Sequence, residues 1–176
     1  MSRVKDRRRK KTSNSTVVHP GRGGKVAVKT NPRSGVVSFF CVHQPAGTSA
    51  KSGYSPSRLI QIIKNGLPVR ELDVLQASLD MPLERLASKL GISKATLHRR
   101  KGQGRLGREE SDRVLRFARL MGKAVEVLEG EENARRWLSS SQFGLGGAVP
   151  LDYAETEVGA REVEDLLGRI EYGVYS

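Results

Sequence analysis

The sequence is poor in cysteine, in aromatic residues and in long apolar runs. Cys41 is the only cysteine, which excludes a disulfide framework and a thiolate metal site and favours a reducing, cytoplasmic compartment. Aromatic residues make up 5% of the 176 residues, so the core must rest on aliphatic side chains, a composition that suits small helices. No apolar run approaches the roughly 20 residues that span a bilayer. We therefore expect a cytoplasmic helical protein that does not contact membranes.

Patterns of catalytic and cofactor-binding residues are also missing. The three histidines are scattered along the chain, which argues against a metal site. Residues 21–25 invite comparison with a phosphate-binding loop, but the Walker pattern needs four residues between its glycines and Ser or Thr after lysine, where this chain has Val26. No nucleophile lies at a telling spacing from a base. We predict no catalytic residue, no cofactor, no metal and no enzymatic activity.

Positive charge is concentrated at the front of the chain. Residues 1–53 carry twelve Lys and Arg against one acid, residues 54–129 carry fifteen against nine, and residues 130–176 carry four against nine. Although the whole chain has a net charge of +12, its last segment is acidic. This gradient predicts two partners, nucleic acid for the basic part and a protein for the acidic part.

Residues 1–53 are expected to be a flexible, largely irregular basic segment. Five consecutive cations at 7–11 repel one another, and many Gly and Pro residues follow. The runs 26–30 and 36–42 are β-like and can form a marginal hairpin. The cations at 7–11 are either an arm that reaches a minor groove or a solvated tail.

Helical periodicity begins at Ser55-Pro56, a good helix start, and continues through a series of apolar stripes. The residues expected on the buried faces of five helices in residues 54–129 are Leu59, Ile60 and Ile63; Leu72, Leu75 and Leu79; Leu83, Leu86, Ala87 and Leu90; Leu97 in a short helix; and Val114, Phe117, Ala118, Met121, Val125 and Leu128. Two more helices are expected around 133–139 and 158–172, the second with an apolar stripe of Val158, Val163, Leu166, Leu167 and Ile170.

The segment 83–101 predicts a helix–turn–helix. Ala87 is small where two helices would cross, and Gly91 permits the left-handed conformation of a sharp turn. Ser93 can accept a hydrogen bond from the N–H of Thr96 and begin the second helix. The order Ala-x-x-x-Gly-Ile-Ser resembles that of Xre-type repressors, which bind palindromic operators as dimers.

The second of these helices is cationic, and its outward side chains suit base edges and phosphates. The residues that we predict to contact DNA are Lys94, Ala95, Thr96, His98, Arg99 and Arg100. The alternative is an ordinary helical hairpin whose Lys and Arg residues form a solvated face.

The end of the chain carries a series of short motifs in a fixed order. These motifs are Ala134-Arg135-Arg136-Trp137-Leu138, Leu145-Gly146-Gly147, Pro150-Leu151-Asp152, residues 159–164 (GAREVE) and residues 167–175 (LGRIEYGVY). Together they resemble the C-terminal domain of the Xre/MbcA/ParS antitoxins, and the resemblance covers about residues 55–176. It implies an antitoxin that dimerises, represses its own operon and neutralises a RES-domain toxin that degrades NAD⁺.

The same resemblance implies that the end of the last helix and the following tail enter the toxin's nucleotide cleft. The residues predicted to bind toxin are Arg169, Ile170, Tyr172, Gly173, Val174, Tyr175 and Ser176. Tyrosines are favoured interface anchors. The alternative is that these last residues form a frayed tail. Trp137 is expected to be a core residue of this domain and not a contact residue.

We therefore predict an all-α protein with a basic segment at 1–53, a DNA-binding domain at 54–129 and a toxin-binding domain at 130–176. The expected partners are operator DNA, a RES-domain toxin and a second copy of the chain, with a higher-order complex when toxin is bound. The alternatives are a stand-alone Xre-type regulator without a toxin, and an adaptor that does not bind DNA.

Overall fold

The computed structural model describes residues 35–41 and 55–173, and every regular element within these ranges is a helix. The predicted all-α architecture is therefore confirmed for this part of the chain. The elements are α1 (Val36–Cys41), α2 (Pro56–Asn65), α3 (Arg70–Leu79), α4 (Leu83–Lys89), α5 (Lys94–Gln103), α6 (Arg108–Val127), α7 (Glu131–Ser139), the 3₁₀ turn η1 (Phe143–Leu145), α8 (Pro150–Tyr153) and α9 (Glu157–Glu171).

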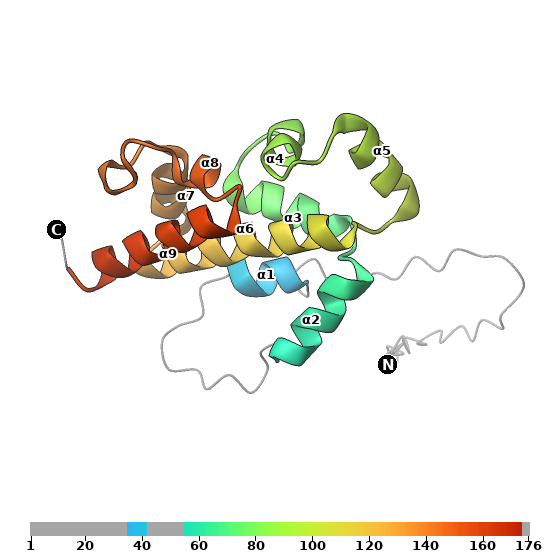
Figure 1. The fold of residues 1–176 in the computed structure, drawn as a ribbon, viewed down its shortest axis with the longest axis horizontal. Coiled ribbons are helices and arrows are strands. Elements are labelled where there is room, and N and C mark those ends of the chain that lie inside the picture. The colour runs from blue at the N-terminus through green and yellow to red at the C-terminus, as the bar shows by residue number, and fades with distance from the viewer. Residues whose placement is uncertain (1–34, 42–54, 174–176) are drawn as a thin grey trace, which may run out of the picture. The chain divides into compact units, whose positions relative to one another are not determined.

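The helix α6 lies at the centre of the packing. Figure 1 shows it running past α1, α3 and α9, and it contacts α2 and α7 as well. Its apolar stripe is buried as predicted except for Leu128, which is half-buried just after the helix, and Phe117, Ala118 and Met121 lie near the middle of the stripe. The buried apolar residues from Val36 to Leu167 form one cluster around it. The helices before α6 and the helices after it therefore share one core.

The helix α1 replaces the β-strand expected at 36–42; the other β-like run, 26–30, lies outside the described residues. Val36 and Val37 are buried, and α1 packs on α3 and α6. The buried carboxylate of Glu71 on α3 accepts the N–H of Val37 at 2.9 Å. The strand prediction was wrong because the β preference of valine is weak compared with these tertiary contacts.

Gly122 on α6 makes the close approach of α1 possible. A Cβ atom at this position would lie 1.9 Å from the carbonyl oxygen of Phe40. Any side chain there would therefore push the two helices apart.

The helix α2 begins and ends as predicted but buries its apolar face only in part. The side chain of Ser55 accepts the N–H of Arg58 at 3.3 Å, and Gly66 follows the helix with φ +76°. However, Leu59 and Ile63 are only half-buried and Ile60 is 51% exposed. The burial expected of Ile60 was therefore wrong, whereas Leu59 and Ile63 pack in part against the core.

Two helices at the end of the chain, α7 and α9, lie close to the predicted positions. In α9, Val163 and Leu167 are buried and Leu166 and Ile170 half-buried, as expected. Val158 is 73% exposed, which contradicts its assignment to the apolar stripe. The small residues at 159–160 are buried instead, and a Cβ atom at position 159 would lie 1.8 Å from the Tyr153 carbonyl oxygen.

Candidate DNA-binding helix and toxin-binding end

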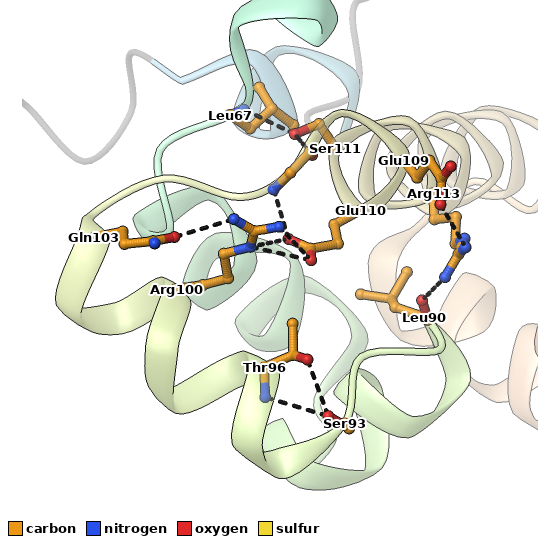
Figure 2. Close-up of polar contacts among 11 residues, drawn as sticks. Leu67, Leu90, Ser93, Thr96, Arg100, Gln103, Glu109, Glu110, Ser111 and Arg113 are labelled. Atoms are coloured by element: carbon orange, nitrogen blue, oxygen red, sulfur yellow. Dashed lines mark hydrogen bonds and ion pairs between the residues drawn. The ribbon is translucent and has the colours of Figure 1, made fainter.

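The helices α4 and α5 are joined by a sharp turn that is built as the sequence predicts. Gly91 has φ +63°, in the left-handed region that glycine tolerates. The N–H of Thr96 donates to the Ser93 side chain at 3.2 Å and so begins α5 (Figure 2). Ile92 and Leu97 are buried and attach the second helix to the first.

The outward face of α5 is cationic. Lys94, Ala95, His98 and Arg99 are exposed on this helix. Thr96 is half-buried, and its hydroxyl accepts a hydrogen bond from Ser93 at 3.0 Å. Lys94 and Arg99 therefore offer the most accessible charges of the predicted DNA-binding set.

Arg100 differs from the rest of that set because its guanidinium already has partners. It donates to both carboxylate oxygens of Glu110 on α6, with Nε 2.8 Å from Oε2 and Nη2 3.0 Å from Oε1 (Figure 2). Nη1 donates to Gln103 at 3.0 Å. Such a two-pronged pair fixes orientation as well as distance. Arg100 thus holds α5 against α6, a role that sequence spacing did not reveal.

A second arginine, Arg113 on α6, supports the turn itself. Arg113 donates to the carbonyl oxygen of Leu90 at 2.8 Å, just before Gly91 (Figure 2). A Leu90 carbonyl that ends α4 has no partner within that helix, so this hydrogen bond satisfies a group that helix ends leave open.

The structure describes only part of the predicted toxin-binding set at the end of α9. Arg169 and Ile170 are half-buried on the last turn, and Tyr172 is 78% exposed. Gly173 follows with φ +67°. Residues 174–176 lie outside the described residues. The chain therefore presents an accessible aromatic side chain where the predicted contact surface begins.

Ion pairs connect α9 to α6 along the length of both helices. Arg116 pairs with Glu157 at 2.9 Å, and Arg119 pairs with Glu164 at 3.0 Å. Lys123 pairs with Glu171, and this hydrogen bond raises the pKa of the Lys123 ammonium above its ordinary 10.5. These three pairs join residues 41 to 48 positions apart, so no local sequence rule finds them.

A further ion pair joins the helix–turn–helix to the end of the chain. Lys89, the last residue of α4, contacts Asp152 of α8. Burial lowers the pKa of Lys89, and the neighbouring charge of Arg85 lowers it further. The α4–α5 pair is thus tied both to α6 and to the acidic last segment.

Two absences concern the described residues alone. Within 35–41 and 55–173 no three His, Cys, Asp or Glu residues gather as a metal-ion site. No helix in these ranges is long and apolar enough to cross a membrane.

Two family models match consecutive parts of the chain. A model described as the antitoxin Xre-like helix-turn-helix domain matches residues 58–119. A model described as the antitoxin Xre/MbcA/ParS C-terminal toxin-binding domain matches residues 123–173. The first match contains α4 and α5, and the second contains α7 to α9.

Several similar proteins are named as antitoxins. A protein named Antitoxin Xre from Yersinia enterocolitica is 39% identical over 120 residues, which are 67% of this chain and 81% of the relative. An Antitoxin Xre from Photorhabdus laumondii is 35% identical over 69% of this chain and 84% of its own length. A Prs ADP-ribosylating antitoxin from a Sphingobium species is 30% identical over 69% of this chain and 83% of its own length. This chain therefore belongs to the Xre/MbcA/ParS family of antitoxins, with an Xre-like helix-turn-helix domain followed by a toxin-binding domain.

Proposed function

We propose that this antitoxin neutralises a RES-domain toxin that degrades NAD⁺, and that it does so by placing the end of α9 and the following tail in the toxin's active site. The observation that carries the proposal is the accessible Tyr172, 78% exposed at the end of a helix that is otherwise fixed to α6. A rigid aromatic group at the end of a fixed helix loses little conformational freedom on binding. The RES identity of the toxin rests on the resemblance of the last segment to Xre/MbcA/ParS antitoxins.

The decisive experiment is co-expression with a RES-domain toxin. We expect the two proteins to purify together, and we expect NAD⁺ degradation by the separated toxin to stop when the antitoxin is returned. The measurement is NAD⁺ concentration against time at increasing antitoxin. Unchanged NAD⁺ degradation at saturating antitoxin would contradict the proposal.

We further propose that the antitoxin represses its own operon by binding the operator as a dimer, with α5 in the major groove. The exposed cations of α5 support this assignment, since outward Lys and Arg on a recognition helix contact bases and phosphates. The same proposal includes a boundary between the two domains at residue 129. It also includes the assignment of single residues to DNA binding and to toxin binding.

Replacement of Lys94 or Arg99 by Ala is expected to weaken operator binding. Loss of one good contact lowers affinity by about 5- to 100-fold, and loss of a phosphate contact reduces the slope of log affinity against log salt by about 1. Fluorescence anisotropy with an operator duplex at several salt concentrations measures both. Arg136→Ala removes an exposed cation on α7 and is the matched control, which should bind as the unaltered chain does. Normal operator affinity of both α5 variants would mean that another surface reads DNA.

A further inference from the structure

Phe143 is the most exposed large apolar side chain in the described part of the chain. The residue is 99% exposed, so its ring packs against nothing. Single exposed apolar residues are common on protein surfaces and need no explanation by themselves. The case for Phe143 therefore depends on the backbone that carries it and on where that backbone lies.

The turn that carries Phe143 is held by a closed set of hydrogen bonds. The N–H of Gln142 donates to the carbonyl oxygen of Ala148 at 3.0 Å, and the N–H of Gly147 donates back to the Gln142 carbonyl at 3.0 Å. The side-chain amide of Gln142 donates to the Trp137 carbonyl at 2.9 Å. These contacts pin both ends of η1 to each other and to α7. The ring is thus displayed from a fixed backbone.

Leu145 and Gly144 attach the same turn to the core and to α9. Leu145 is buried, which directs the rest of η1 inward while Phe143 points out. Gly144 lies so close to α9 that a Cβ atom there would be 2.6 Å from the Leu166 side chain. Leu166 and Ile170 are one helical turn apart, and Tyr172 follows at the end of the helix. Phe143 and Tyr172 therefore belong to two elements in direct contact.

We propose that Phe143 is a second anchor for the toxin, inserted into an apolar pocket beside the cleft that the tail enters. This inference rests on the proposed function. Three observations favour the toxin as the occupant: the match to the toxin-binding domain model includes Phe143, the turn contacts α9, and residues 130–176 as a whole carry net negative charge. The expected toxin pocket is apolar at its centre and basic at its rim, since opposite charges across an interface favour the right partner.

Phe143 is suited to binding because its backbone is already held in place before the toxin binds. When such a side chain enters a pocket, it loses the conformational entropy of its own rotamers but none from the backbone. Most of the free energy gained by burying the ring therefore remains as binding free energy. Buried aromatic anchors near the middle of an interface are the residues whose removal weakens binding most.

The test compares toxin affinity of Phe143→Ala with that of the unaltered antitoxin. We expect the dissociation constant for the co-expressed RES-domain toxin to rise by about tenfold or more, mainly through faster dissociation. Because the ring packs against nothing, thermal unfolding and operator affinity should stay unchanged. Phe143→Leu should retain part of the affinity. Ile60→Ala, which removes an exposed apolar side chain from α2, is the matched control and should leave toxin affinity unaltered.

The outcomes separate this inference from the function on which it rests. If the unaltered chain binds toxin and Phe143→Ala binds equally well, Phe143 is no anchor, although the proposed function stands. If the unaltered chain binds no RES-domain toxin, the proposed function fails first. If Phe143→Ala changes only the association of the antitoxin with itself, measured by sedimentation, the ring contacts a second copy and the inference is wrong.

Discussion

Deletion of residues 172–176 is expected to abolish toxin neutralisation while operator binding persists. The deletion removes Tyr172 and the tail residues that the proposed function places in the toxin's active site. Two tyrosine anchors at about 2 kcal/mol each correspond to a loss of affinity of about 100- to 1000-fold. An NAD⁺ degradation assay with purified toxin, titrated with the truncated antitoxin, measures the loss.

The fold should tolerate this truncation because the core ends before it. Leu167 is the last fully buried residue of α9, and Tyr172 is exposed. The ion pair of Glu171 with Lys123 remains in the truncated chain. Replacement of Tyr153, another partly exposed tyrosine of the same domain, by Ala is the matched control and should neutralise toxin normally. Full neutralisation by the truncated chain would exclude the tail as the inhibitory element.

Substitution of Gly159 by Ala is expected to destabilise the protein by about 3 kcal/mol, although alanine is the better helix former. The added methyl group would lie 1.8 Å from the Tyr153 carbonyl oxygen, which is backbone and cannot rotate away. The start of α9 would have to move away from α8 and from the core. Urea unfolding, followed by helical circular dichroism, gives the change in the free energy of unfolding.

Gly168 supplies a control on the same helix. A Cβ atom at this position meets nothing within 4 Å, so Gly168→Ala should stabilise the protein by roughly 0.5–1 kcal/mol through helix propensity alone. The two substitutions make the same chemical change in one helix and are expected to differ in sign. Equal effects would mean that the contact between residues 153 and 159 does not govern the packing of α9.

The helix–turn–helix could be predicted from the sequence because its determinants are local. Gly91 adopts the expected left-handed conformation, and the Ser93 side chain accepts the expected N–H. The buried stripe of α6 follows directly from the 3.6-residue period. Each of these features depends on residues within a few positions of one another.

The features that sequence reasoning missed depend on contacts between distant residues. The β-branched residues at 36–37 favour a strand until the carboxylate of Glu71 and the surface of α6 are present. Arg100 has the same local surroundings in the sequence as Arg99, and only the fold of the chain brings it to Glu110 on α6. Val158 fits the helical period of α9 but is exposed, while the Gly159 backbone packs so closely on the Tyr153 carbonyl that no side chain fits at 159.

The shared position of α6 limits how this antitoxin can be recombined. Its one face packs against α3 of the DNA-binding part and another against α7 and α9 of the toxin-binding part, and its cations pair with the acids of α9. A chimera that joins two relatives just after α6 would combine an α6 from one parent with an α9 from the other. Such a chimera therefore keeps these ion pairs only if the arginines and lysine of α6 are inherited together with their carboxylate partners.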